Sequence, residues 1–491
     1  MFSHVQATAA VAGSITHAVY FIHGYHDASA ARIFLFYLLA DVTLVSLAVR
    51  EYGLFQGAAT TATLSLWYFS GLFLSIAGYR LFFHPLRKFP GPVVAKLSKT
   101  IYGPYMNRSG KMHLEQDKMH QKYGDFIRTG PNELCIFSPS AHNKIHGPHS
   151  QCSKAGTAYE ALLFNGEPNL DSMVDHETHR WRRQIWDKAL ASTTALNQYE
   201  PTVRRVVHEW LAKIKGNATL DTSLFSVLIG MEVGGQVGYS KELGVVKAGK
   251  QNTLQHLLEQ LFGGVSALGH LAWPIFLVQG LGYKGDLGRF EQAVIAMTEE
   301  KEKSGGHDIM QHLLDDHYAP KPKFFTNRNM LYADAELILT ASTETVGATM
   351  SYAFYHLAQN AHVRKQLREE LLPLFGKTIP GEFAAQGLGD KSASYLSAVI
   401  NETLRLHNPT LNEIQRTTPP QGLDVDGVHV PGDVVVSVSV YSMNRSERCF
   451  KQAQEFIPER WTTRQELIVD RGAFYPFLEG RLLPLRSPPV L

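Results

Sequence analysis

The sequence predicts a mainly α-helical fold with a minor β portion, preceded by helices that span a membrane. Three observations lead to this prediction. Apolar stretches fill the first eighty residues, each near the roughly 20 residues that cross a bilayer. Amphipathic stretches such as Ala361 to Phe375 then dominate to about residue 420, and strand-like alternation is confined to short segments. Because no internal repeat is present, we expect one large domain after the apolar region.

The overall composition excludes several classes of protein. Among 491 residues, 47 basic and 45 acidic side chains leave a net charge of +2, so no concentrated basic excess is available for nucleic acid. Only three cysteines occur, Cys135, Cys152 and Cys449, without C-x-x-C spacing. A disulfide framework and a structural zinc site are therefore not expected, and the soluble part is predicted to face a reducing compartment.

The first eighty residues contain three apolar stretches, at roughly 5–22, 31–49 and 53–79. The third fits a membrane span best, because it carries no charge and ends at Arg80. Basic residues that follow it give the cytoplasmic side its expected positive bias. A cleaved signal peptide is not favoured, because the start lacks basic residues and the apolar character continues far beyond one short core.

The first two apolar stretches also contain polar residues. Arg32 and Asp41 lie in the second, and Gln6, Thr16 and His17 lie in the first. Interfacial helices and spans paired inside a small bundle therefore both stay open. We expect residues 1–80 to form a membrane anchor with up to three transmembrane segments.

Residues 81–92 contain three prolines and a glycine that cannot continue a helix, so they are predicted to form a stiff hinge. Beyond this hinge, strands are expected at 126–137, 422–430 and 433–440. The last two are predicted to be joined by the turn dipeptide at 431–432.

The segment Leu337 to Val346 has the pattern of a long apolar helix, yet it brings small and polar groups together. Hydroxyl side chains inside a helix bond to a carbonyl one turn earlier and can bend the helix. The small Ala341 leaves room for a ligand, and Glu344 beside Thr345 places an acid next to an alcohol that can pass protons. The alternative is an ordinary helix with an internally bonded Thr and a surface Glu, since short motifs often match by chance.

A second constellation joins two segments about fifty residues apart. Glu402 and Arg405 lie three residues apart, on one helical face, where they can pair. Such a pair alone occurs by chance, but Pro458 to Trp461 adds a second arginine, Arg460, at a proline-fixed turn. A buried Glu with two Arg partners forms a network whose members are costly to remove singly.

In this order and spacing, these segments make the chain resemble the cytochrome P450 family. Ala341 to Thr345 resembles the family's oxygen-activating A/G-G-x-D/E-T motif, with Ser342 at the usual glycine position. Glu402 to Arg405 resembles its E-x-x-R motif, and Pro458 to Trp461 its P-E-R-F/W motif. The resemblance runs from about Tyr79 to Gly480.

Three further segments resemble the same family. His179 to Asp187 resembles the helix over a haem propionate, with His179 and Arg183 at the contacting positions. Arg416 resembles the strand arginine that binds the other propionate region, and Gly130 to Leu134 resembles an early strand of fungal members. The apolar start resembles that of fungal members devoted to secondary metabolites.

The resemblance implies a haem (heme) cofactor and a monooxygenase of a lipophilic small molecule. Electrons would come from NADPH-cytochrome P450 reductase, and the membrane would be that of the endoplasmic reticulum with the catalytic domain cytosolic. Thr345 would hydrogen-bond bound dioxygen and Glu344 would help deliver protons. Glu402, Arg405 and Arg460 would hold the core behind the haem.

The family's ligand loop, F-x-x-G-x-R-x-C-x-G, supplies the cysteine thiolate that favours O–O cleavage. Phe477 and Gly480 provide its opening in register. Leu482 then stands at the arginine position, Pro484 at the cysteine position and Arg486 at the final glycine position. Proline offers iron no ligand, so no metal-ligating residue is predicted there.

No other residue is expected to replace this ligand. Cys135 lies in an early strand, Cys152 follows a polar pair, and Cys449 precedes a region that the family places away from the iron. A free cysteine commonly acts as a small hydrophobic residue. None of the 22 histidines occupies the loop position.

Two hypotheses follow from this departure. In the first, the chain is a monooxygenase of a secondary-metabolite substrate, impaired as written. In the second, it is a catalytically silent membrane protein that uses the same fold to bind an apolar ligand or a partner. We expect residues 93–480 to form the catalytic domain and 481–491 an aberrant tail, since the resemblance stops within two residues of Gly480. An altered reading frame or splice junction would explain so abrupt a break.

Overall fold

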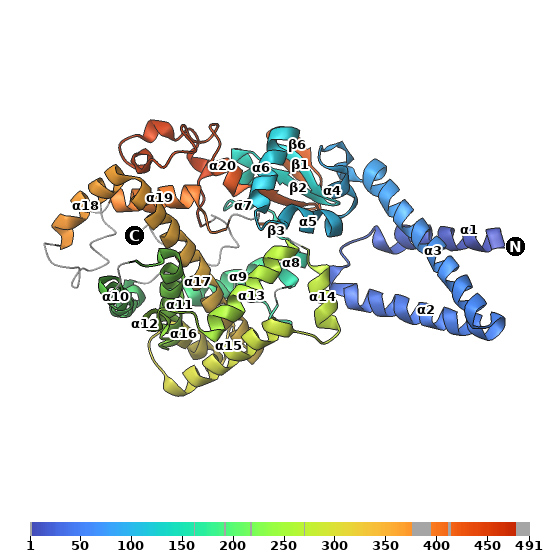
Figure 1. The fold of residues 1–491 in the computed structure, drawn as a ribbon, viewed down its shortest axis with the longest axis horizontal. Helices are drawn as coiled ribbons and strands as arrows, with labels where there is room; N and C mark the ends of the chain where they lie inside the picture. The colour runs from blue at the N-terminus through green and yellow to red at the C-terminus, as the bar shows by residue number, and fades with distance from the viewer. Residues whose placement is uncertain are drawn as a thin grey trace.

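The computed structural model describes residues 2–161, 163–190, 193–216, 219–269, 271–375, 394–410 and 414–477. Within these residues helices far outnumber strands, and a bundle of three helices projects from the helical body (Figure 1). The predicted mainly α fold with a minor β portion is confirmed. Gly480, Pro484 and the tail from residue 481 lie outside the described residues.

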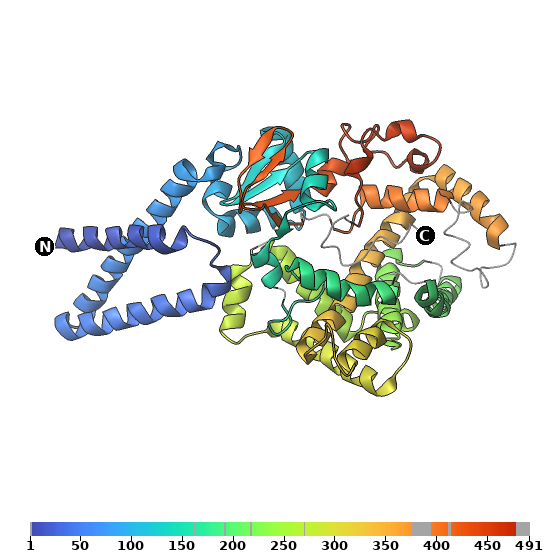
Figure 2. The ribbon, with the colours of Figure 1, turned by 180° about the vertical axis from the view of Figure 1, so that it is seen from behind.

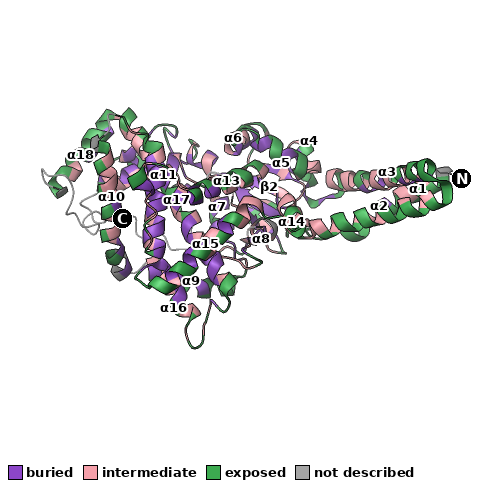
Figure 3. Cartoon of the chain, turned by 60° about the horizontal axis from the view of Figure 1, so that its bottom comes forward, coloured by how far each residue is buried: buried purple, intermediate pink, exposed green. Residues whose placement is uncertain are grey.

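The projecting helices form what we call the anchor bundle: α1 (Phe2–Thr16), the π-helical turn η1 (His17–Phe21), α2 (Ala30–Tyr52) and α3 (Leu54–Gly78). Two helical segments, Asp27–Tyr52 and Leu54–Phe83, are long and apolar enough to cross a membrane. Their side chains are largely exposed, as the green of α2 in Figure 3 shows. This exposure is consistent with membrane attachment. The first of the three predicted spans, at 5–22, is not among these segments in the described part of the chain.

The polar residues of α1 are used in contacts with α3. His17 Nδ1 lies 2.8 Å from Ser75 Oγ, and Tyr68 donates a hydrogen bond to Thr16 Oγ1 at 2.9 Å. The two backbones approach closely, because a Cβ added to Gly13 would lie 2.0 Å from the Tyr68 carbonyl oxygen. Small residues and interhelical hydrogen bonds are the means by which membrane helices associate. This stretch is therefore paired with α3, and its place as a membrane span or an interfacial helix stays a prediction.

Hydrogen bonds connect the segment after α3, which includes the proline-rich residues 85–92, to the body. The segment contains a short 3₁₀ helix, η4 (Pro85–Lys88), whose first turn is capped by His84. The Arg80 guanidinium donates to the Leu97 carbonyl oxygen at 2.5 Å. Arg128, from the sheet, donates to the Arg80 carbonyl oxygen at 2.8 Å. These bonds hold the end of α3 in a fixed position against the body.

The body begins with α4 (Val93–Leu97), α5 (Lys99–Asn107), α6 (Met112–Tyr123), α7 (Pro139–His146), α8 (Gly156–Glu160), α9 (His176–Leu190), α10 (Thr193–Gly216), α11 (Thr222–Tyr239) and α12 (Val245–Ala248). It continues with α13 (Thr253–Leu268), α14 (Trp273–Gly280), α15 (Gly285–Ser304), α16 (Ile309–His317), α17 (Arg328–Gln359), α18 (Ala361–Phe375), α19 (Ser394–Leu406) and α20 (Val440–Asn444). Asp221, Asn252, Asp308 and Asn327 cap α11, α13, α16 and α17, each accepting a backbone N–H bond.

The main sheet has five short strands in the order β1-β2-β7-β4-β3. Their bounds are β1 (Phe126–Gly130), β2 (Glu133–Ile136), β3 (Ser153–Lys154), β4 (Arg416–Thr417) and β7 (Val435–Val438). The β2–β7 pair is parallel and the other pairs are antiparallel. The predicted strand at 126–137 is therefore a hairpin of β1 and β2.

The prediction that 422–430 pairs with 433–440 is wrong. Residues 422–430 fold on themselves as β5 (Leu423–Val425) and β6 (Val428–Val430) around Asp426 and Gly427, both with positive φ. An Asp-Gly pair between alternating residues is a stronger hairpin signal than the Pro-Gly that follows it. Strand β7 instead joins the main sheet and gives way to α20.

Helix α17 is the central element of the helical body, and α11 packs along it. Gly230, Gly234 and Gly238, spaced one turn apart on α11, make this close approach possible. A Cβ added to Gly234 would lie 2.1 Å from Ser342 Oγ, and one added to Gly238 would lie 2.4 Å from Ile338 Cγ2. The row of glycines thus fixes the position of the α17 segment that carries the predicted acid and alcohol.

Candidate active site

A buried ion pair fixes α9 to the central helix α17. Arg182 Nε and Trp186 Nε1 donate to Asp334 Oδ2 at 2.9 and 2.8 Å, and the Leu170 amide donates to Asp334 Oδ1 at 2.8 Å. The Arg182 and Asp334 side chains are fully buried. Because three donors satisfy one carboxylate, α9 is held in register, and its residue His179 lies one turn before this anchor.

His179 is fully buried, and neither of its ring nitrogens has a hydrogen-bond partner among the described residues. Burial lowers its pKa to about 3, and the charges of Lys154, Arg183 and Arg416 add to this effect. A buried polar group without a partner is rare in folded proteins and calls for an explanation. His179 thus lies within the electrostatic influence of Arg183 and Arg416, and the roles of these three residues toward a cofactor stay a prediction.

Arg416 lies on β4, directly opposite Lys154 on β3. Its guanidinium Nη1 donates to the Tyr159 hydroxyl at 2.9 Å and to the Gln415 carbonyl oxygen at 3.0 Å. Lys154 is buried and donates to the backbone carbonyls of residues 170 and 171. Burial lowers the Lys154 pKa to about 8. Sequence reasoning missed Lys154 and Tyr159, because only strand pairing brings them beside Arg416.

We call His179, Arg183, Arg416 and Lys154 the basic cluster. Within it, Arg183 Nε lies 3.5 Å from Asp187, one turn along α9. Three cationic side chains and the imidazole nitrogens of His179, which have no partner among the described residues, form a setting that attracts carboxylates. Charged donors bond carboxylates most strongly. The cluster therefore has the donors that an anionic group of a bound cofactor requires.

Helix α7 carries two more buried histidines, and both lie near Arg416 of β4. His142 and His146 are one turn apart, and the Tyr475 ring stacks on His142 with centroids 3.6 Å apart. Burial lowers the pKa of both, with Arg416 adding to the effect. Neither His142 Nε2 nor His146 Nδ1 has a partner in the described part of the chain. Their four-residue spacing was the signal from which they could have been found.

The polar segment of α17, Leu337 to Val346, has one side packed against α11 and another side exposed. Ser342 packs against Gly234 of α11, so the glycine row takes up the side chain that replaces the family's usual glycine. Thr345 and Ala341 are exposed, and Thr345 Oγ1 donates to the Ala341 carbonyl oxygen at 2.6 Å. Glu344 is half-buried, and its Oε1 has no partner among the described residues. Burial raises the pKa of Glu344 and the charge of nearby Glu259 adds to this, which favours the protonated acid.

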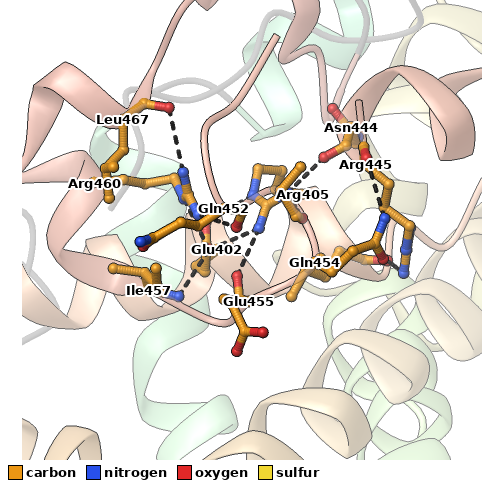
Figure 4. A network of polar contacts seen from close by, with 12 residues as sticks. Glu402, Arg405, Asn444, Arg445, Gln452, Gln454, Glu455, Ile457, Arg460 and Leu467 are labelled. Atoms are coloured by element: carbon orange, nitrogen blue, oxygen red, sulfur yellow. Dashed lines mark hydrogen bonds and ion pairs between the residues drawn. The ribbon is translucent and has the colours of Figure 1, made fainter. Parts of the chain in front are cut away.

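Glu402 is the centre of a buried network (Figure 4). Arg405 donates to both of its carboxylate oxygens at 2.9 and 2.8 Å, and Arg460 Nε donates to Oε1 at 2.9 Å. The Ile457 amide and the Trp461 indole complete its bonds at 2.9 and 3.0 Å. The three charged side chains are fully buried.

Both arginines also hold backbone in place on the two sides of η7 (Pro458–Trp461), from the end of α20 to η8 (Gln465–Leu467). Arg405 donates to the carbonyl oxygens of Asn444, Ala453 and Glu455, and Arg460 to those of Lys451, Gln452 and Leu467. Four of these six carbonyls, those of residues 451, 452, 453 and 455, lie between α20 and η7, where the chain forms no helix. The network therefore fixes a loop that secondary structure alone would leave free.

The ligand-loop side of the site is only partly described. Phe477 is about half exposed, and nothing beyond it is described. The three cysteines are buried; burial raises the pKa of Cys449 to about 11 and that of Cys152 above its ordinary value. Raised pKa values disfavour the thiolate that binds iron. The described residues also contain no group of three or more potential metal ligands.

Comparison with known proteins was decisive. The family model described as Cytochrome P450 matches residues 94–481. This chain belongs to the cytochrome P450 family. Cytochrome P450 monooxygenase FCK2 of Fusarium pseudograminearum is 31% identical over 486 residues, which cover 96% of this chain and 86% of the relative. Cytochrome P450 monooxygenase sthD of Phaeosphaeria nodorum is 33% identical, covering 87% and 90%. Tryprostatin B 6-hydroxylase of Aspergillus fumigatus is 30% identical, covering 99% and 87%.

As a fungal-type cytochrome P450, the chain is an oxidoreductase of the monooxygenase class with haem as its cofactor. The residues present fit one part of that cofactor. The basic cluster has buried, unpartnered nitrogens suited to the propionate carboxylates. For the iron, burial raises the pKa of the Cys152 and Cys449 thiols, and in the sequence Pro484 falls where the family's loop pattern has its cysteine.

Proposed function

We propose that this cytochrome P450 acts, in its intact form, as a monooxygenase of a lipophilic secondary-metabolite substrate. The observation that carries the proposal is the fully buried His179, without a partner for either ring nitrogen, beside Arg183 and Arg416. In this proposal these side chains and Lys154 hold the haem propionates. The tryprostatin B hydroxylase among the relatives supports a secondary-metabolite substrate.

The central helix would supply the proton chemistry. Bound haem supplies the activation of oxygen, which the amino acids cannot perform themselves. Glu344 holds its proton more firmly than an ordinary carboxyl and has a free oxygen, so it can donate and reload a proton. Thr345, one residue on, presents its hydroxyl on the exposed face of α17. The Glu402 network would hold the loop behind the cofactor.

We further propose that the chain as written is impaired and that residues 481–491 are not the ancestral tail. The family match ends at Arg481, one residue before Leu482, the first position that departs from the ligand-loop pattern. The tail has three prolines and no cysteine. Sequencing the transcript and its genomic neighbourhood tests this. An R-x-C-x-G coding stretch in some frame shortly downstream of Gly480 is expected, and its absence would favour the silent binding protein instead.

The domain organisation is proposed as a membrane anchor at 1–80, a hinge at 81–92 and a catalytic domain at 93–480. We place the anchor in the endoplasmic reticulum with the catalytic domain cytosolic, where NADPH-cytochrome P450 reductase would supply electrons. Across α1 and η1, Thr16 and His17 bond to α3, whereas Val11, Ile15 and Val19 have more than half of their surface exposed. An outward apolar face supports α1 as a third span inside lipid.

Haem retention tests the proposed cofactor site. The purified full chain is loaded with haemin in detergent, and the ratio of haem to protein is read from absorbance after gel filtration. His179→Ala and Arg416→Ala are expected to lower this ratio, because each removes a group that meets a propionate. Arg180→Ala, an exposed change on the same helix, is the control. Equal ratios for all four proteins would contradict the proposed site.

A further inference from the structure

A groove of about 570 Å³ lies between α4, α5 and α6. The ribbons show α4 and α5 beside the end of α3, where the anchor bundle meets the body (Figures 1 and 2). Met106 and Met119 are buried along the groove, whereas Val94, Ile101 and Tyr105 are exposed at 47%, 65% and 56%. Its size falls within the roughly 300–1,000 Å³ of small-ligand sites. We call it the α5–α6 groove.

The groove lies next to the end of the anchor bundle that joins the body. Helix α4 packs on the turn that ends α3, and Arg80 of that turn donates to Leu97 at the end of α4. Phe82 and Phe83 in the same turn are 64% and 70% exposed. Exposed apolar side chains therefore lie both on the turn that ends α3 and on the α4 and α5 residues that line the groove. Large exposed apolar patches of this kind mark interaction sites for membranes or other partners.

Basic side chains surround the mouth of the groove. Lys118 and Lys122 come from α6, and the Arg108 guanidinium lies 4.2 Å from the centre of the Tyr105 ring. Glu115 is the one acidic residue in the groove lining, and it pairs with Lys118 at 2.8 Å. The mouth therefore keeps an excess of positive charge next to an apolar interior, the arrangement that suits an anionic amphiphile.

We propose that the α5–α6 groove binds an anionic phospholipid of the membrane in which the protein is anchored. An acyl chain lies against Ile101 and the two methionines, whose flexible side chains adapt to irregular apolar shapes. The phosphate lies between Lys118 and Lys122. The inference rests on the proposed membrane attachment, and it adds a specific lipid partner to it.

Native mass spectrometry of the full chain in detergent tests the lipid site. Phosphatidylserine and phosphatidylcholine are added separately at equal concentration, and the retained lipid is measured. The wild type is expected to retain one phosphatidylserine in preference to phosphatidylcholine. Ile101→Asp should abolish retention of both lipids, and the double change Lys118→Glu and Lys122→Glu should lower phosphatidylserine retention by about tenfold or more. Lys365→Glu, an exposed change on α18, is the matched control.

Two results would overturn the lipid site: equal retention of the two lipids by the wild type, or retention by both groove variants that matches the control. Alkaline extraction of cell membranes separates this failure from failure of the anchor. All variants are expected in the membrane pellet, because α2 and α3 are unchanged. Release of every variant and the wild type would overturn membrane attachment itself, and the lipid site with it.

Discussion

Arg405 donates through Nε and Nη2 to the two carboxylate oxygens of Glu402, and both side chains are fully buried. Arg460 bonds the same carboxylate. Removing the acid therefore strands two arginines in the interior. Breaking a buried pair in this way costs about 3–5 kcal/mol, which is comparable with the stability of a whole domain.

We expect Glu402→Ala to lose folded protein rather than to show a selective kinetic defect. Expression yield and thermal melting followed by circular dichroism measure this. Glu369→Ala is the control, because Glu369 is exposed and its ion pair with Lys365 spans 3.9 Å. Its effect should stay below about 1 kcal/mol. Normal yield and melting for Glu402→Ala would contradict the role given to the network.

Asp334→Asn should weaken the joint between α9 and α17. The substitution leaves the buried Arg182 without its counter-charge, and the loss is expected at about 3–5 kcal/mol. Because α9 carries His179 and Arg183, the variant should also bind less haem per folded molecule than the wild type does. Arg180→Ala, which breaks an exposed pair at 3.9 Å, is the control for both measurements. A variant that melts and binds haem like the control would rule out this positioning role.

The raised pKa of Glu336, on α17, leads us to expect that the stability of the protein depends on pH. Burial, with a contribution from Glu291, raises the Glu336 pKa to about 8 from the ordinary 4.5. The folded protein thus holds this proton more tightly than the unfolded chain, so Glu336 lowers stability as pH rises from 4.5 to 8. Glu336→Gln should therefore gain stability relative to the wild type across that window, with no further gain above it. Melting temperatures measured at intervals from pH 5 to pH 9 check this, and a constant difference between the two proteins would count against it.

The topology of the anchor bundle can be read with single cysteines, because the three native cysteines are buried. We expect an impermeant maleimide to label Arg87→Cys in intact microsomes. His4→Cys and Gln56→Cys, at the opposite end of the bundle, should react only after permeabilisation (Figure 1). Labelling of His4→Cys without permeabilisation would show that α1 does not cross.

Deletion of the residues before Arg80 should release much of the protein from membranes.

Much of the fold could be predicted from periodicity and spacing. The amphipathic stretch at 361–375 is α18 with the same bounds, and the membrane-length stretches begin and end near α2 and α3. The β5–β6 hairpin could have been predicted from its Asp-Gly turn, the stronger of the two turn signals at 422–440. The pairing of β7 with β2 and β4 could not, because only tertiary contacts decide it. Single-sequence periodicity gives no register between distant strands.

Some residues of the candidate site could likewise be predicted from the sequence, and others could not. Motif residues such as Glu402 and Arg460 could be found because their spacing is recognisable in the sequence. Lys154, Tyr159 and Asp334 could not, since each acquires its significance from a partner more than a hundred residues away in the chain. The glycine row of α11, which accommodates Ser342, is likewise visible only once α11 and α17 are packed together.

The carbonyl spectrum of the reduced, haem-loaded protein shows whether a thiolate binds the iron. We propose that the basic cluster binds haem while Pro484 occupies the position at which the family has its iron-binding cysteine. The chain as written is therefore expected to retain haem and yet to lack the absorption band of thiolate-ligated carbonyl haem. A form carrying the restored R-x-C-x-G loop should show that band. A thiolate-type spectrum from the chain as written would contradict the account.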